Sequence, residues 1–202
     1  MNNINTYIIK KFDIDNLNVK LPSFYKASKN ETKLAYLLLN YLYYEKFKKI
    51  LNINLIAKDD NNKPIFLNNN IFFNISHSKN YVCCSLANIN IGIDLEEDRD
   101  IKENVLNKII NEKDKNIAPI KIWNIKEAYS KYLGIGLKLD FSKISVKEIK
   151  KNTILNTFFH NINNTNIYFS ICCDKNKYIS NNINFIDENT ITNFYYKKYI
   201  KF

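Results

Sequence analysis

Each half of the chain carries one long helical pattern and several short strand patterns, and this repeated order limits the folds it can adopt. In residues 33–50, apolar side chains recur almost all round a helix, which is typical of a helix covered on several sides. A second long helix is predicted from Trp123 to Leu133, with Gly134 placed to end it. A chain of 202 residues can bury one large core, or two cores of about 100 residues each.

Short runs rich in Ile, Val, Tyr and Phe are predicted to be strands. These runs cover residues 6–12, 71–75, 81–87, 89–95, 144–149, 154–159, 166–173 and 178–186. The segment FFNISHSKNYVCCSL resembles FFHNINNTNIYFSICC, which indicates an internal duplication, with chance similarity in Asn-rich sequence as the alternative. No Gly, Ser or Pro linker separates the halves. The predicted domains are residues 1–97 and 98–202.

The net charge of +10 favours anionic partners, namely nucleic acid, acidic proteins or polyphosphate ligands. All basic residues except Arg99 are lysines in a chain crowded with Asn, Ile, Tyr and Phe, so an A/T-rich genome can account for part of the lysine excess. No run of about 18 apolar residues is present, which excludes a membrane span. Because the N-terminus does not have the pattern of a signal peptide, the predicted location is the cytoplasm.

The four cysteines occur as two adjacent pairs, Cys83-Cys84 and Cys172-Cys173, in apolar strand-like runs. Neighbouring residues on a strand point to opposite faces, so a disulfide within either pair would be strained. Neither pair has the C-x-x-C spacing of a zinc or redox site. The cysteines are therefore predicted to be reduced and buried.

The segment Ile91 to Glu96 combines a strand pattern with acidic side chains. Because side chains alternate along a strand, Gly92, Asp94 and Glu96 are predicted to share one face. Two carboxylates on one face repel each other unless a cation or several donors lie between them, and such hard oxygen ligands suit magnesium. The alternative is an acidic, solvated turn, because two more acidic residues follow.

In the segment WNIKEAYSK, Trp123, Glu127 and Lys131 recur every four residues and are predicted to share one face of a helix. In a functional interpretation, Glu127 is a third metal-facing carboxylate or a base, and Lys131 is a point charge for phosphate. The alternative is a surface Glu–Lys salt bridge worth about 0.3–0.5 kcal/mol.

Two further segments carry candidate phosphate-binding residues. The run FNISHS places Ser76 and His77 between a strand and a loop, where a phosphate-binding turn competes with a structural role for the histidine. A Ser-His-Asp hydrolase triad is less attractive, because no G-x-S-x-G elbow is present. Pro64 fixes its own φ and biases Lys63 to an extended conformation, which would aim the lysine at a partner.

Taken in order, these segments resemble the 4′-phosphopantetheinyl transferase superfamily, in its larger type typified by the surfactin synthetase activator. The family pattern runs G-K-P, N-x-S-H-S, G-I-D-[IV]-E, W-x-x-K-E-A-x-x-K and G-x-G-L. The corresponding segments are residues 62–64, 74–78, 92–96, 123–131 and 134–137. Asn62 replaces the glycine of G-K-P, and Leu95 replaces the usual Ile or Val. The stretch from 97 to 122 is shorter than in many relatives, which leaves the partner preference open.

The resemblance implies an α+β fold and an enzymatic activity. The implied fold is a monomeric pseudo-dimer of two similar α/β halves, each a long helix packed on a small antiparallel sheet, with the active site in the cleft between them. The implied reaction transfers 4′-phosphopantetheine from coenzyme A to a serine of an acidic apo acyl or peptidyl carrier protein. Its products are the holo-carrier protein and adenosine 3′,5′-bisphosphate, and its cofactor is Mg²⁺, with Mn²⁺ as the alternative.

The resemblance also implies roles for individual residues. The implied metal ligands are Asp94, Glu96 and Glu127, and Glu127 is also the candidate general base for the carrier serine. The implied catalytic set is Glu127, Lys131 and His77. The implied coenzyme A contacts are Lys33, Lys63, Pro64, Ser76, His77 and Lys131.

Two other classes of function remain open from the sequence. A basic, aromatic-rich chain with strands can be a non-catalytic RNA-binding module, although it has no RNP or KH signature. That alternative leaves Asp94, Glu96 and Glu127 unexplained. A degenerate transferase that binds coenzyme A without transferring its phosphopantetheine is the third interpretation.

Overall fold

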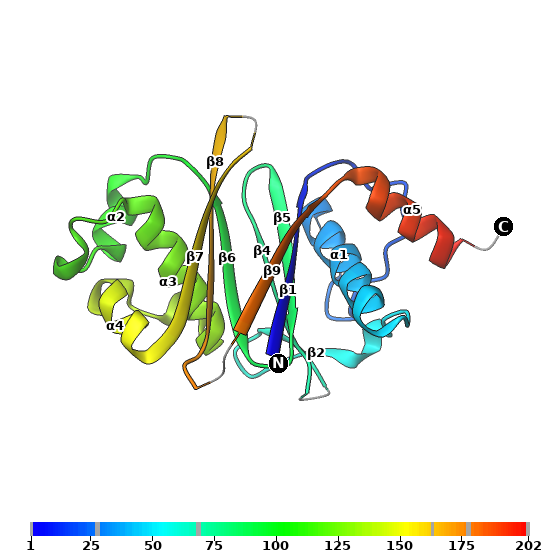
Figure 1. Cartoon of the computed structure of the whole chain (residues 1–202), viewed down its shortest axis with the longest axis horizontal. Helices are drawn as coiled ribbons and strands as arrows, with labels where there is room; N and C mark the ends of the chain where they lie inside the picture. Colours follow the sequence, from blue (N-terminus) through cyan, green and yellow to red (C-terminus); the bar gives the residue numbers. More distant parts are fainter. Residues whose placement is uncertain (1, 27–28, 68–69, 163, 177–178, 201–202) are drawn as a thin grey trace. The chain divides into compact units, whose positions relative to one another are not determined.

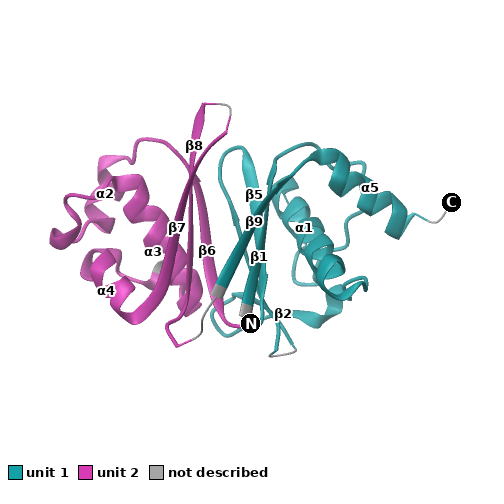
Figure 2. Ribbon diagram, in the orientation of Figure 1, with its two compact units in different colours: residues 1–88, 179–202 teal, residues 89–178 magenta. Residues whose placement is uncertain are grey.

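The computed structural model of the chain is a mixed α+β protein, as predicted (Figure 1). It describes residues 2–26, 29–67, 70–162, 164–176 and 179–200. The chain divides into two compact units, which are residues 1–88 with 179–202 (unit 1) and residues 89–178 (unit 2) (Figure 2). Among the described residues, no helix has the length and apolar character needed to cross a membrane.

Unit 1 is a four-stranded sheet with the long helix α1 (Asn30–Phe47) packed on it. The sheet order is β4-β5-β1-β9, and its strands are β1 (Asn2–Lys10), β4 (Phe72–His77), β5 (Tyr81–Ala87) and β9 (Ile179–Ile186). Leucines along α1 are fully buried because they face this sheet and the C-terminal helix α5 (Glu188–Tyr199). Strand β1 is antiparallel to β5 but parallel to β9, so this sheet is mixed rather than purely antiparallel.

Unit 2 is a three-stranded antiparallel sheet with helix α3 (Pro119–Leu133) packed on it. The sheet order is β6-β8-β7, and its strands are β6 (Ile91–Glu97), β7 (Thr153–Ile162) and β8 (Thr165–Asp174). The shorter helices α2 (Glu103–Ile109) and α4 (Val146–Asn152) contact α3. Helix α3 ends at Gly134, which has a φ of 74°, as the sequence predicts.

The two units share one order of elements, namely a strand, a long helix and a hairpin. These elements are β1, α1 and β4–β5 in unit 1, and β6, α3 and β7–β8 in unit 2. In both sheets the last strand of the hairpin lies between its partner strand and the first strand of the series. This equivalence supports an internal duplication.

The predicted boundary after residue 97 does not coincide with the division into units. Strand β6 opens unit 2, because it pairs with β8 over its whole length. Strand β9 follows unit 2 in the chain but belongs to unit 1, because it pairs with β1. The division therefore falls one strand earlier than predicted, and the end of the chain returns to the first unit.

Two elements differ from the sequence prediction. Residues 144–149 were expected to form a strand, but the structure has helix α4 there, because Ser145 and Glu148 form a reciprocal capping box at its start. Helix α5 is also absent from the prediction, although Asp187 caps it by accepting from the backbone N–H of Thr190. Ser145 and Glu148 were read as parts of a strand, and Asp187, which follows the predicted strand at 178–186, was not recognised as a helix cap.

The four cysteines are buried thiols, as predicted. Cys83 and Cys84 lie on β5, and Cys172 and Cys173 lie on β8, which are the equivalent strands of the two sheets. Their side chains act as small apolar groups in the cores of the units.

Gly92 sets how closely α3 can approach β6. A Cβ atom at this position would lie 2.1 Å from both the Ala128 carbonyl oxygen and the Tyr132 backbone nitrogen. We expect Gly92→Ala to destabilise unit 2 by about 3 kcal/mol, because the helix backbone must move away. Denaturant unfolding followed by the fluorescence of Trp123, the single tryptophan, measures this change.

Gly136→Ala is the matched control, because a Cβ there would meet no atom within 4 Å among the described residues other than its two neighbours, and only its φ of 55° is unfavourable. That change should cost about 1 kcal/mol. Equal losses for the two glycine variants would contradict the close-approach argument.

Candidate active site

Gly92, Asp94 and Glu96 of β6 lie on one face of the strand, as predicted, and this face packs against α3. The Lys131 Nζ lies 2.7 Å from the Asp94 Oδ1, and the Trp123 Nε1 donates a hydrogen bond of 2.7 Å to the Glu96 Oε1. The strand and the helix run in opposite directions here, so Gly92 meets the last turn of α3 and Glu96 meets Trp123. The two motifs of the sequence therefore form one cluster within unit 2.

Asp94 is almost fully buried, with 3% of its surface exposed, and both of its carboxylate oxygens are engaged. Its Oδ1 contacts Lys131, and its Oδ2 accepts a 3.0 Å hydrogen bond from the Asn124 Nδ2. Burial of a carboxylate is costly unless cations and donors compensate it. Lys131 and Asn124 supply that compensation.

Glu96 lies at the outer end of the cluster. Arg99 approaches it, with 3.3 Å between the Arg99 Nε and the Glu96 Oε2. Burial raises the pKa of Glu96, and the neighbouring Asp94 raises it further, while Arg99 and Trp123 act in the opposite direction. The mutual effect shows that the two carboxylates lie close enough to repel each other.

Glu127 is the third predicted carboxylate, and it comes from the same face of α3. Burial raises the pKa of Glu127 to about 7. The charge of Lys131 lowers this pKa, whereas Asp94 and Glu96 raise it. Glu127 is therefore within electrostatic reach of the other two carboxylates, and it titrates near neutral pH.

The donor set has the chemistry that magnesium prefers, because all three candidate ligands are carboxylates. Burial is the main cause of the raised pKa values of Glu96 and Glu127, and the charges of the neighbouring carboxylates, which a cation would offset, raise them further. Within the described part of the chain, however, no three His, Cys, Asp or Glu side chains already surround one point where a metal could bind. A cation that takes all three carboxylates as ligands would therefore move at least one of these side chains.

The raised pKa of Glu127 predicts a pH-dependent affinity for Mg²⁺. A carboxylate must lose its proton to bind the ion, and with a pKa of about 7 Glu127 is mostly protonated at pH 6 and mostly ionised at pH 8. We expect the Mg²⁺ affinity to rise about tenfold between these two pH values. Titration with MgCl₂, followed by Trp123 fluorescence, measures the affinity.

Glu127→Gln is the control for this prediction, because it removes the titrating group. It should bind Mg²⁺ more weakly and flatten the pH dependence. An affinity of the unchanged protein that is equal at pH 6 and pH 8 would contradict the assignment.

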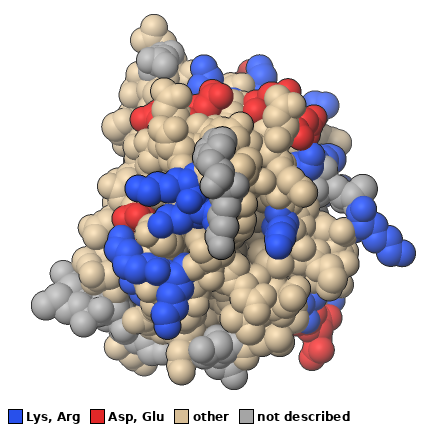
Figure 3. Space-filling model, turned by 90° about the vertical axis from the view of Figure 1, so that its right-hand side faces the viewer, with Lys and Arg blue, Asp and Glu red and all other residues tan. Residues whose placement is uncertain are grey.

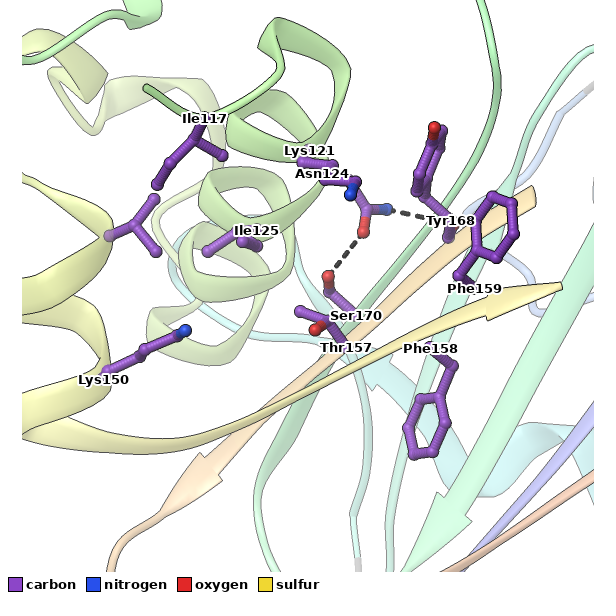
Figure 4. Close-up of a pocket in the computed structure, with 11 residues that line it drawn as sticks. Ile117, Lys121, Asn124, Ile125, Lys150, Thr157, Phe158, Phe159, Tyr168 and Ser170 are labelled. Atoms are coloured by element: carbon purple, nitrogen blue, oxygen red, sulfur yellow. Dashed lines mark hydrogen bonds between the residues drawn. The ribbon is translucent and has the colours of Figure 1, made fainter. Parts of the chain in front are cut away.

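A pocket of about 270 Å³ lies on the other side of Asn124, between α3, α4 and the β7–β8 hairpin (Figure 4). Its wall includes Lys121, Asn124, Lys150, Phe158, Phe159 and Tyr168. Ser170 and Asn124 also line the pocket and are hydrogen-bonded to each other, and the same Asn124 side chain contacts Asp94. Asn124 therefore lies between the pocket and the carboxylate cluster.

The remaining predicted site residues belong to unit 1 and lie on three different elements. Lys33 is on α1, where its Nζ lies 2.8 Å from the Asp15 Oδ1. Ser76 is buried on β4, and His77 is exposed at the end of that strand. Lys63 precedes β3 (Pro64–Phe66), and burial lowers the pKa of Lys63 to about 8 despite the opposing charge of Asp59.

The replacement of glycine by Asn62 in the G-K-P motif has a structural explanation. Asn62 has a φ of 66°, in the left-handed region. Glycine adopts this conformation readily, and asparagine does so more easily than most other residues. Asn62 is therefore compatible with the left-handed backbone at this position, as glycine would be.

Three residues of the cluster were not found from the sequence as site residues, namely Arg99, Asn124 and Ser170. Asn124 could have been noticed as a polar residue on the buried face of α3, four positions from Ile120 and Ala128. Ser170 gives no such signal, because a serine within a strand is common. Its role depends on pairing between β8 and β6, which opposes Ser170 to Asp94.

Basic side chains gather on one face of the molecule (Figure 3). In unit 1, the Lys198 Nζ lies 4.2 Å from the centre of the Tyr44 ring. A hydrogen bond from Lys198 and the charges of Lys48 and Lys197 lower the pKa of Tyr44. Lys48, Lys197 and Lys198 therefore lie around the Tyr44 ring.

Unit 2 is thus an α+β domain in which Asp94 of β6 contacts Lys131 of α3, with Glu96 and Glu127 within electrostatic reach. Residues 90–179 match the family model described as the 4′-phosphopantetheinyl transferase superfamily. The resemblance to that superfamily predicted from the motifs is confirmed over these residues.

Two curated relatives agree with this family. The chain is 28% identical over 112 residues to the 4′-phosphopantetheinyl transferase gsp of Aneurinibacillus migulanus, covering 50% of this chain and 47% of the relative. It is 35% identical over 106 residues to the L-aminoadipate-semialdehyde dehydrogenase-phosphopantetheinyl transferase of Candida glabrata, covering 42% of this chain and 40% of the relative. The chain thus spans less than half the length of each relative. Neither comparison supports the RNA-binding alternative.

Proposed function

We propose that the chain transfers 4′-phosphopantetheine from coenzyme A to a serine of an acyl or peptidyl carrier protein, giving the holo-carrier protein and adenosine 3′,5′-bisphosphate. The observation that carries this proposal is the cluster of Asp94, Glu96, Glu127 and Lys131 inside the segment that matches the superfamily. Both relatives are phosphopantetheinyl transferases by name.

Asp94, Glu96 and Glu127 would hold Mg²⁺ or Mn²⁺. When bound, the ion neutralises the pyrophosphate and acts as a Lewis acid at phosphorus. Lys131, which contacts Asp94, would supply a positive charge to the phosphates. Glu127 would remove the proton of the carrier serine, directly or through water, because its pKa of about 7 suits a general base at neutral pH.

The residues of unit 1 would bind the rest of coenzyme A. His77 would donate a hydrogen bond to its pyrophosphate or 3′-phosphate, and Ser76 would contribute from the same strand. Lys63, preceding Pro64, would hold the nucleotide end, and Lys33 is the candidate for the adenosine phosphates. The net charge of +10 supports an acidic carrier as the partner, because complementary charge speeds encounter. The cytoplasmic location and the monomeric state stay predictions.

The test is incubation of the protein with coenzyme A, MgCl₂ and apo-carrier proteins of the fatty-acid, polyketide and peptide-synthetase types. Mass spectrometry should find one added phosphopantetheine group, which chelation of Mg²⁺ should prevent. A carrier whose acceptor serine is replaced by alanine is the control and should gain no mass.

Two outcomes would contradict the proposal. Coenzyme A binding without transfer to any carrier would favour a degenerate transferase. A steeply salt-dependent affinity for RNA, without coenzyme A binding, would favour the RNA-binding alternative.

A further inference from the structure

A buried chain of hydrogen bonds connects β8, α3 and β6 in unit 2. The Ser170 hydroxyl donates to the Asn124 Oδ1, and the Asn124 Nδ2 donates to the Asp94 Oδ2 (Figure 4 shows the first of these bonds). The exposed fractions of Ser170, Asn124 and Asp94 are 0%, 2% and 3%. Because these three side chains are shielded from water, they have few hydrogen-bond partners other than one another.

The donors and acceptors of these two hydrogen bonds determine the orientation of the Asn124 amide group. A serine hydroxyl that donates to the amide oxygen leaves the amide nitrogen to face the carboxylate. The same nitrogen also approaches the Tyr168 carbonyl oxygen at 3.4 Å, which again favours a donor at that place. A flipped amide would set its oxygen against the Asp94 carboxylate and the Tyr168 carbonyl, and both contacts would be repulsive.

The orientation of Asn124 in turn determines which oxygen of Asp94 faces the candidate site. Because Asn124 holds Oδ2, the oxygen on the Lys131 side is Oδ1. A cation that takes Asp94 as a ligand at that side uses Oδ1 and competes with the Lys131 ammonium for it. Residues that orient a ligand in this way commonly change metal affinity without touching the metal.

We propose that Asn124 and Ser170 are positioning residues, which hold Asp94 with its Oδ1 toward Lys131 and so prepare it to bind a divalent cation. This inference rests on the proposed function, because it takes Asp94 as a metal ligand. Neither residue contacts the reacting groups in this scheme. Ser170 acts only through Asn124.

The test uses Trp123, which is the single tryptophan and donates a hydrogen bond to Glu96. Its fluorescence reports cation binding at the cluster without any need for transfer activity. The variants are Asn124→Ala, Ser170→Ala and the double variant, titrated with MgCl₂ and with MnCl₂. Asn90→Ala is the matched control, because the Asn90 Nδ2 donates to the Tyr132 carbonyl oxygen at the far end of the same strand–helix contact.

Asn124→Ala should weaken Mg²⁺ binding about 10- to 100-fold, and Ser170→Ala should weaken it less. The double variant should bind no more weakly than Asn124→Ala, because the Ser170 hydroxyl, although Ser170 is opposite Asp94 in the sheet, donates to Asn124. Asn90→Ala should bind Mg²⁺ as the unchanged protein does, whatever stability it loses. Additive effects of the two single variants, or an unchanged affinity in folded Asn124→Ala, would overturn the inference.

Cation binding by the unchanged protein distinguishes a failure of this inference from a failure of the proposed function on which it rests. If its fluorescence responds to Mg²⁺ while Asn124→Ala responds equally, the positioning role alone is wrong. If the unchanged protein does not bind either cation, both the metal site and the positioning role are wrong. Should Asn124→Ala fail to fold, Ser170→Ala decides, since an affinity equal to that of the unchanged protein would overturn the role.

Discussion

Replacing Lys126 by alanine is expected to destabilise unit 2 by about 3–5 kcal/mol, because it leaves a buried carboxylate without its cation. The Lys126 side chain is fully buried, and its Nζ lies 2.8 Å from the Asp114 Oδ2. The same ammonium donates to the carbonyl oxygens of Ile109 and Phe141, at 2.7 and 2.9 Å. Through these contacts Lys126 connects α3 with the segments that precede and follow it in the chain.

Denaturant unfolding followed by Trp123 fluorescence measures this effect, since Trp123 lies in unit 2. Lys108→Ala is the control, because Lys108 is an exposed lysine of α2 and its loss should change stability by no more than about 0.5 kcal/mol. The double variant Lys126→Met with Asp114→Leu should lose less stability than Lys126→Ala, since it removes both buried charges together. A loss below about 1 kcal/mol for Lys126→Ala would contradict the structural role.

The lysine of W-x-x-K-E-A is therefore held in the core, whereas the next residue, Glu127, takes part in the candidate site. The sequence could not separate these roles, because both side chains are charged and adjacent on one helix. Burial of Lys126 depends on Asp114 and on two carbonyl groups from segments whose loop conformations no periodic pattern predicts. Tertiary contacts decide which of two neighbouring charges is structural.

The carboxylate cluster could be predicted because it follows from local periodicity. Alternation along β6 places Gly92, Asp94 and Glu96 on one face, and the helical repeat places Trp123 and Lys131 on one face of α3. These two faces can pack closely because Gly92 has no side chain to hold the backbone of α3 away. The contacts of Lys131 with Asp94 and of Trp123 with Glu96 follow directly.

The division into units could not be predicted in the same way, because strand pairing is not local. The sequence shows that β6 and β9 are strands, but both could have paired within either half. Their partners are β8 and β1, and β1 lies more than 160 residues before β9 in the chain. Asn124 and Ser170 were missed for the same reason, since their hydrogen bonds join three elements that meet only in the folded unit.

Asp94→Asn is expected to lower the rate of Mg²⁺-dependent phosphopantetheine transfer about 100- to 1000-fold while the chain stays folded. The asparagine keeps the shape of the side chain, but it removes the negative charge that would draw Mg²⁺ to the cluster. Asn124 and Lys131 would each face a neutral amide instead of a carboxylate, and both contacts weaken. Transfer is measured by mass spectrometry of the carrier, and Mg²⁺ affinity by Trp123 fluorescence.

Asp98→Asn provides the matched comparison, because it makes the same change of charge just after β6, at an exposed residue. The Asp98 Oδ2 accepts a 3.3 Å hydrogen bond from the Asn166 Nδ2, away from the cluster. Transfer by Asp98→Asn should therefore equal that of the unchanged protein. If Asp94→Asn also transfers at that rate, Asp94 does not hold the cation. If both variants fail equally while folded, the loss is not specific to Asp94, because removing a negative charge would speed rather than slow encounter with an acidic carrier.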